Sequence, residues 1–70
     1  MPQVAIQLRE GRDLQDVRRL ISAVTAAVVS SLAIPTETVR VIVTEVPTSH
    51  WANGDVTLAE KAAGVRGNTL

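Results

Sequence analysis

The sequence predicts an α/β fold, a β-α-β unit with two parallel strands followed by a C-terminal hairpin. Three patterns predict it: an alternating apolar stretch at residues 3–8, a segment of helical spacing from Asp13 to just before Pro35, and a β-branched run at 39–46. A strand, a helix of about five turns and a second strand are typical of a crossover between parallel neighbours. We expect a single domain over residues 1–70.

The first strand is predicted from strict alternation. Val4, Ile6 and Leu8 alternate with polar or small residues, so they occupy one face of a strand. Residues 9–12 break the pattern, and Gly11 permits a sharp turn.

The helix has a clear beginning and end in the sequence. Asp13 is a favourable N-cap, and Asp16 complements the helix dipole in the first turn. Pro35 ends the helical pattern. The apolar residues at helical spacing are Val17, Leu20, Ile21, Val24, Val28 and Leu32.

The run at 39–46 is nearly continuous in β-branched residues, which is typical of a strand covered on both faces. Further on, Asn53-Gly54 predicts a small hairpin within residues 50–56.

The C-terminal region predicts a short second helix. Thr57 and Glu60 form a capping-box pattern ahead of Leu58–Ala63, and Gly64 would close the helix. The last six residues resemble a tail that becomes ordered only when a neighbour holds it.

Composition predicts self-association. A chain of 70 residues buries only about 60% of its unfolded surface. There is no cysteine to form disulfides and His50 is the only histidine, which argues against a metal site built by the protein. Yet 46% of the residues are hydrophobic and the mean hydropathy is +0.19. Because a β-α-β unit leaves two open sheet edges and an uncovered face, we expect an oligomer.

The charge balance excludes several classes of partner. Seven basic and seven acidic residues cancel, and Trp51 is the only aromatic residue, so we expect no nucleic-acid partner. No apolar run approaches the ~18 residues of a membrane span, and we expect no membrane association. No signal peptide is visible, so the expected location is cytoplasmic.

Four features in register resemble one enzyme family. They are Pro2 directly after the initiator, Glu10-Gly11-Arg12 with Asp13 close behind, the run from Val39 to Glu45, and His50-Trp51. Over residues 2 to about 54 the chain resembles the 4-oxalocrotonate tautomerase family, the short-chain members of the tautomerase superfamily.

The resemblance implies a single tautomerase-like domain acting without a cofactor on a small carboxylic acid substrate. It implies a homo-hexamer arranged as a trimer of dimers, or a heterohexamer with a related chain, in which subunits share the sites. Members of the family ketonise 2-hydroxymuconate and similar dienols in aromatic catabolism.

Pro2 matches the catalytic base of the family. Once Met1 is removed, Pro2 carries a secondary amine, which is a base when neutral. Free α-amines titrate near pH 8, and nearby arginines together with burial would lower the pKa of the Pro2 amine. The alternative is that Pro2 simply begins a strand.

Arg12 and Arg40 match the arginines that hold substrate carboxylates and polarise the carbonyl in the family. A guanidinium stabilises the dienolate charge that develops when a proton moves between atoms of a conjugated acid. Arg40 interrupts an apolar strand, where a charge without a partner is unfavourable. Trp51 takes the place of a phenylalanine that lines the pocket. Arg12 could instead be a turn residue, and Trp51 could belong to a core.

Arg9 departs from the tautomerase pattern, which has leucine there. With Arg12 it resembles the α subunit of heterohexameric haloacrylic acid dehalogenases, in which an arginine pair grips the carboxylate. Asn53 stands where that subunit has a water-activating glutamate. An amide cannot act as that base, so water addition is disfavoured unless Asp55 or a partner chain substitutes. A dehalogenase or hydratase subunit, and a non-catalytic subunit of a heterohexamer, are therefore the alternatives to a tautomerase.

Overall fold

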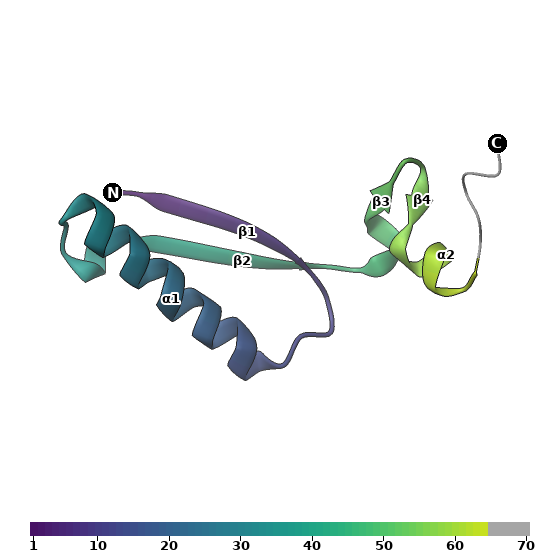
Figure 1. The fold of residues 1–70 in the computed structure, drawn as a ribbon, viewed down its shortest axis with the longest axis horizontal. Helices are drawn as coiled ribbons and strands as arrows, with labels where there is room; N and C mark the ends of the chain where they lie inside the picture. The colour runs from purple at the N-terminus through teal and green to yellow at the C-terminus, as the bar shows by residue number, and fades with distance from the viewer. Residues whose placement is uncertain (65–70) are drawn as a thin grey trace.

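A computed structural model describes residues 1–64 of the chain. A strand, a helix and a second strand form its body (Figure 1). These elements are β1 (Gln3–Arg9), α1 (Leu14–Leu32) and β2 (Arg40–Val46), with a short 3-10 turn, η1 (Thr36–Thr38), before β2. The two strands pair in parallel, from Gln3 beside Arg40 to Arg9 beside Val46. The predicted β-α-β fold is confirmed, with one correction: Arg9 continues β1 because it still pairs with Val46.

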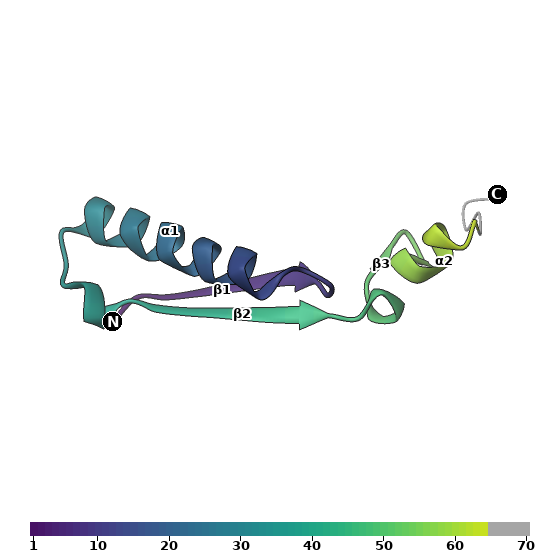
Figure 2. The ribbon, with the colours of Figure 1, turned by 90° about the horizontal axis from the view of Figure 1, so that it is seen from below.

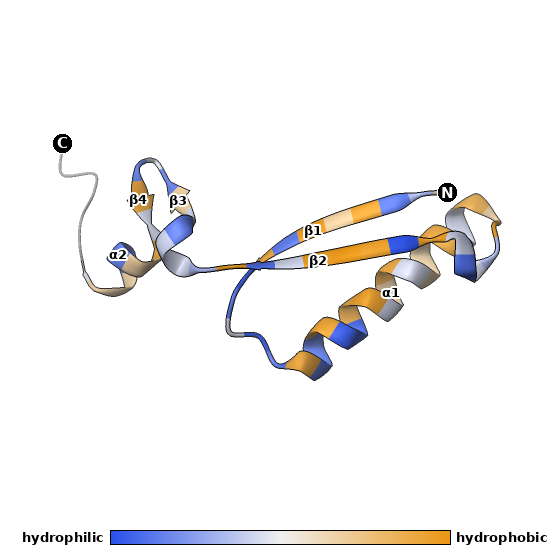
Figure 3. Ribbon diagram, turned by 180° about the vertical axis from the view of Figure 1, so that it is seen from behind, coloured by the Kyte–Doolittle hydropathy of each residue, from blue (hydrophilic) through white to orange (hydrophobic). Residues whose placement is uncertain are grey.

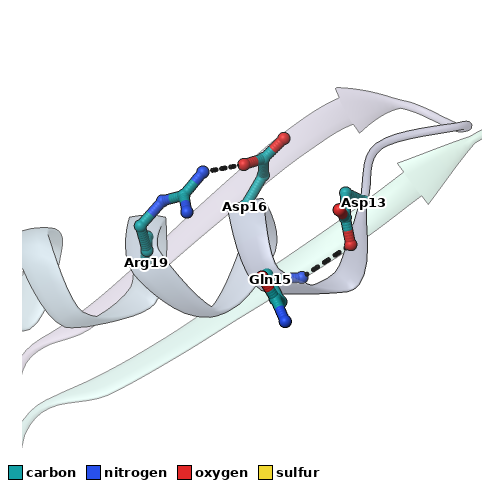
Figure 4. Close-up of polar contacts among 4 residues, drawn as sticks. All are labelled: Asp13, Gln15, Asp16 and Arg19. Carbon is teal, nitrogen blue, oxygen red and sulfur yellow. Dashed lines mark hydrogen bonds and ion pairs between the residues drawn. The ribbon is translucent and has the colours of Figure 1, made fainter.

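Helix α1 begins and ends as its sequence predicts. Asp13 has extended backbone angles, and its side chain accepts a hydrogen bond from the backbone N–H of Gln15 at 3.1 Å (Figure 4). One turn on, Asp16 forms an ion pair with Arg19 (Figure 4). At the other end Ala33 adopts a left-handed conformation, and its N–H donates to the carbonyl of Val29 at 2.9 Å. The hydrogen bonds of Asp13 and Ala33 satisfy backbone groups that a helix leaves without partners at its ends.

Helix α1 covers one face of the two-stranded sheet and leaves the other open (Figure 2). Exposure alternates along β1 and from Arg40 to Thr44 of β2, with Val4, Ile6 and Leu8 of β1 half-buried beneath the helix. Glu45 breaks the alternation because it is exposed. Within this chain β2 is thus covered on one face only, whereas its continuous apolar run predicted cover on both. The residues of the open face, called the bare face below, are Gln3, Ala5, Gln7, Arg9, Arg40, Ile42 and Thr44.

The C-terminal segment forms an arm that projects beyond the β-α-β body (Figures 1 and 2). It contains η2 (Thr48–His50), β3 (Ala52–Asn53), β4 (Val56–Thr57) and α2 (Leu58–Ala62). The predicted hairpin is confirmed, but its turn is made by Gly54 and Asp55, since Asn53 pairs with Val56. Both turn residues have positive φ, 60° and 68°, as a tight hairpin turn requires.

The capping box of α2 is also confirmed. The Thr57 N–H donates to Glu60 Oε1 at 2.9 Å, and the Glu60 N–H donates to Thr57 Oγ1 at 3.0 Å. Gly64 follows with φ 88°, and its N–H donates to the carbonyl of Lys61 at 3.1 Å. The tail predicted for residues 65–70 lies outside the described residues.

No residue between 1 and 64 is fully buried. Leu14 is 78% exposed, Leu32 58% and Ile42 43%, and apolar residues recur along α1 and β2 (Figure 3). The radius of gyration is 16.4 Å, whereas a compact domain of this length has about 11 Å. No helix within this described part is long and apolar enough to cross a membrane. Residues 1–64 of a single chain therefore lack the packed interior that normally stabilises a domain.

We predict that Asp13→Ala lowers the free energy of unfolding by about 1 kcal/mol, because it removes the N-cap of α1. Urea denaturation at fixed protein concentration measures the effect. Ser31→Ala, at an exposed position near the other end of α1, is the matched control. Equal midpoints for the two variants would contradict the capping role.

Candidate functional site

Pro2 and Arg40 lie together at the end of the sheet where both strands begin. Pro2 directly precedes β1, and its carbonyl accepts a hydrogen bond from the backbone N–H of Arg40 at 2.9 Å. Pro2 is half-buried, while Arg40 is exposed and pairs with Gln3 on the bare face. This end of the sheet therefore brings together Pro2, which directly precedes β1, and Arg40, the first residue of β2.

Arg9 and Arg12 lie together at the opposite end. Arg9 ends β1 and Arg12 lies in the loop that leads to α1. The loop is fixed by the Glu10 N–H, which donates to the carbonyl of Val46 at 3.0 Å, and by Gly11, whose φ of 104° suits glycine. These residues open onto a surface hollow of about 740 Å³, called the arginine hollow below. It is lined by Arg9, Glu10, Gly11, Arg12, Glu45 and Thr48.

Trp51 lies beyond the same end of the sheet, where the arm begins. It is half-buried, and its carbonyl accepts a hydrogen bond from the Leu58 N–H at 2.8 Å. Its side chain contributes to a second hollow of about 260 Å³, formed with Gln7, Val46, His50 and Ala52. Trp51 thus lines a hollow of mixed polar and apolar character near the carboxyl end of the strands.

His50 is exposed, with Nδ1 2.7 Å from Ser49 Oγ. This pair has a local contact and no link to Pro2 or to the arginines within the described part of the chain.

The five site residues predicted from the sequence do not converge within one chain. Pro2 and Arg9 are separated by the full length of β1, which amounts to about 23 Å at 3.3 Å per residue. The structure brings Pro2 close to Arg40 and Arg9 close to Arg12, while Trp51 lies on the side of the second pair. The candidate site therefore consists of two half-sites at opposite ends of the sheet.

Comparison with known proteins identifies the family. The family described as "Tautomerase enzyme" matches residues 2–61. The chain belongs to the tautomerase family. It is accordingly an isomerase.

Three relatives show how far the similarity extends. The 2-hydroxymuconate tautomerase of Pseudomonas sp. strain CF600 is 38% identical over 66 residues, which cover 94% of this chain and 98% of that protein. The crystal structure of TomN, a 4-oxalocrotonate tautomerase homologue in the tomaymycin biosynthetic pathway, is also similar. The two chains share 44% sequence identity, and the TM-score is 0.85 over 89% of this chain and 95% of TomN. A heterohexamer 4-oxalocrotonate tautomerase from Chloroflexus aurantiacus J-10-fl is 35% identical, with a TM-score of 0.81 over 86% and 97% of the two chains.

In this tautomerase the sequence interpretation missed part of the arginine hollow. Glu10, Glu45 and Thr48 line it together with the two arginines. Parallel pairing predicts that the two strand ends meet, but only the register, which pairs Glu45 with Leu8, places Glu45 at the hollow. Thr48 lies in a turn beyond β2, and its approach to the hollow could not be read from spacing alone.

We predict that Gly11→Ala lowers the free energy of unfolding by about 1 kcal/mol or more. A methyl group at Gly11 would meet no atom within 4 Å, so the cost comes from the positive φ of 104° rather than from a clash. Urea denaturation beside the Ser31→Ala control measures it. A Gly11→Ala protein as stable as the control would show that the loop relaxes to negative φ.

Proposed function

We propose that this tautomerase interconverts the enol and keto forms of small unsaturated 2-hydroxy acids such as 2-hydroxymuconate, without a cofactor. Pro2 would be the general base once Met1 is removed. The observation that best supports this proposal is the position of Pro2 beside Arg40, at the exposed beginning of two parallel strands. The similarity to a 2-hydroxymuconate tautomerase supports the substrate class.

The chemistry needs a free amine at Pro2. Met1 is 82% exposed, so an aminopeptidase can reach it. With Met1 attached the Pro2 nitrogen is an amide and cannot accept a proton; without Met1 it is a secondary amine. The neutral amine takes the proton from the enol hydroxyl and returns a proton to a carbon of the conjugated chain. The Arg40 guanidinium stabilises the negative charge that develops on the dienolate oxygen.

Arg12, Arg9 and Trp51 would complete the site. Two guanidinium groups in one hollow suit a carboxylate, because each presents a planar fork of N–H donors. The indole of Trp51 would form a wall against a flat conjugated acid. All three lie at the end of the sheet away from Pro2.

A second copy of the chain would bring the two half-sites together. A six-carbon acid is far shorter than the distance of about 23 Å along β1, so it cannot contact Pro2 and Arg12 of the same chain. The bare face and the absence of a buried core in residues 1–64 leave apolar surface for such an assembly. We propose a homo-hexamer, a trimer of dimers, in which each copy is one domain of residues 1–70. A heterohexamer with a related chain is the alternative.

Pro2→Ala is predicted to lower kcat for 2-hydroxymuconate ketonisation by about 10²- to 10⁴-fold, because it replaces the secondary amine that accepts the proton. The decay of dienol absorbance measures kcat, after intact mass has shown that Met1 is absent. Pro35→Ala, at a proline between α1 and β2, is the matched control and should keep full activity.

The outcomes separate the candidate functions. Activity retained in Pro2→Ala would contradict the base assignment. A wild-type protein with a free Pro2 that fails to ketonise the dienol would favour a dehalogenase or hydratase subunit, for which Arg9 beside Arg12 is the supporting feature. Halide release from a haloacrylate in the presence of a partner chain tests that second function.

Shared half-sites also predict rescue between two inactive variants. Pro2→Ala and Arg12→Gln, each inactive alone, are mixed in equal amounts, unfolded and refolded together. About a quarter of the wild-type activity should return, because each half-site is intact in half of the copies and the two come from different chains. Refolding each variant separately is the control. No recovery in a mixture that sediments as an oligomer would contradict the shared site, as would an active monomer.

A further inference from the structure

Gln3 and Arg40 form a pair of polar residues on the bare face, where both strands begin. They are register partners across β1 and β2, and both are exposed. Helix α1 covers the opposite face of the sheet (Figure 2). Neighbouring strands lie about 4.8 Å apart, so an amide and a guanidinium project side by side from the same face.

The Gln3 amide supplies a second kind of donor at this end of the sheet. Within residues 1–64 neither the Gln3 nor the Arg40 side chain has a hydrogen-bond partner. The amide nitrogen of glutamine can donate two hydrogen bonds, and its oxygen can accept. Gln3 also directly follows Pro2, whose carbonyl accepts the Arg40 N–H at 2.9 Å. A neutral donor therefore stands beside the charged donor of the proposed site.

We propose that Gln3 is a specificity-determining residue that donates a hydrogen bond to the oxygen at carbon 2 of the acid, beside Arg40. This inference rests on the proposed function, in which Arg40 stabilises that oxygen. A carbonyl or dienolate oxygen has lone pairs for two donors at once, and each donor stabilises the developing negative charge. An acid without an oxygen at carbon 2 leaves these donors without partners, which costs binding free energy. The pair thus favours 2-oxo and 2-hydroxy acids over acids that lack this oxygen.

The test compares adipate with 2-oxoadipate, two saturated six-carbon dicarboxylic acids that differ only in the oxo group at carbon 2. Titration calorimetry of the assembled protein, freed of Met1, gives both dissociation constants. The wild-type protein should bind 2-oxoadipate more tightly than adipate. Gln3→Met keeps the length of the side chain but removes the donor, so it should reduce this preference by about three- to tenfold. Gln15→Met makes the same substitution at an exposed position on α1, outside the candidate site, and should leave the preference unchanged.

Gln3→Glu separates contact with the substrate from positioning of Arg40. A glutamate can still hold the Arg40 guanidinium, but its carboxylate has no N–H to donate. Its negative charge weakens both dianions, so the ratio of the two dissociation constants is the readout. A donor role predicts that the preference falls in Gln3→Glu as it does in Gln3→Met. A preference retained in Gln3→Glu would show that Gln3 only orients Arg40, and would overturn the proposal.

Three other results would also overturn it: no preference in the wild-type protein, an unchanged preference in Gln3→Met, or an equal loss in Gln15→Met. Neither acid contains a dienol, so the preference is measured without ketonisation. Activity retained in Pro2→Ala would therefore contradict the base assignment and leave the role of Gln3 to be decided by calorimetry alone.

Discussion

The parallel pairing of β1 with β2 determines where every candidate site residue can lie. Because the strands run in the same direction, Pro2 and Arg40 meet where both begin, and Arg9 and Glu45 line one hollow where both end. Helix α1 must return the chain across the full length of the sheet, and it covers one face as it does so. Separation of proline from the arginine hollow is thus built into the topology.

The individual elements could be predicted because their signals are local. Asp13 and Pro35 bracket α1, alternation identifies β1, and the Thr57–Glu60 capping box starts α2. Arg9 was misplaced because a charged residue at a strand end interrupts the apolar pattern without ending the backbone pairing. The hairpin turn was displaced by one residue because Asp55, like Gly54, can adopt a left-handed conformation.

The site was harder to predict from the sequence than the fold was. Residue types and a family resemblance could nominate Pro2, Arg12 and Arg40. The spacing of these residues does not indicate that Pro2 and Arg40 lie at one end of the sheet and Arg12 at the other. The register had to be known before Glu45, which pairs with Leu8, could be placed at the arginine hollow. The topology predicted an uncovered face, but the residues on it, such as the exposed Ile42 of the bare face, could be placed only from the structure.

The lack of a buried core in residues 1–64 also affects how such an enzyme responds to its own concentration. When side chains become buried only between copies, folding and association are a single equilibrium, and stability depends on how much protein is present. Catalytic output then rises more steeply than expression, because scarce chains remain both unassembled and unfolded. In a cell that makes little of this chain, the protein would be too dilute to assemble, and proteases would degrade the unfolded chains. Activity would then appear only above a threshold rate of synthesis, which would act as a simple form of control.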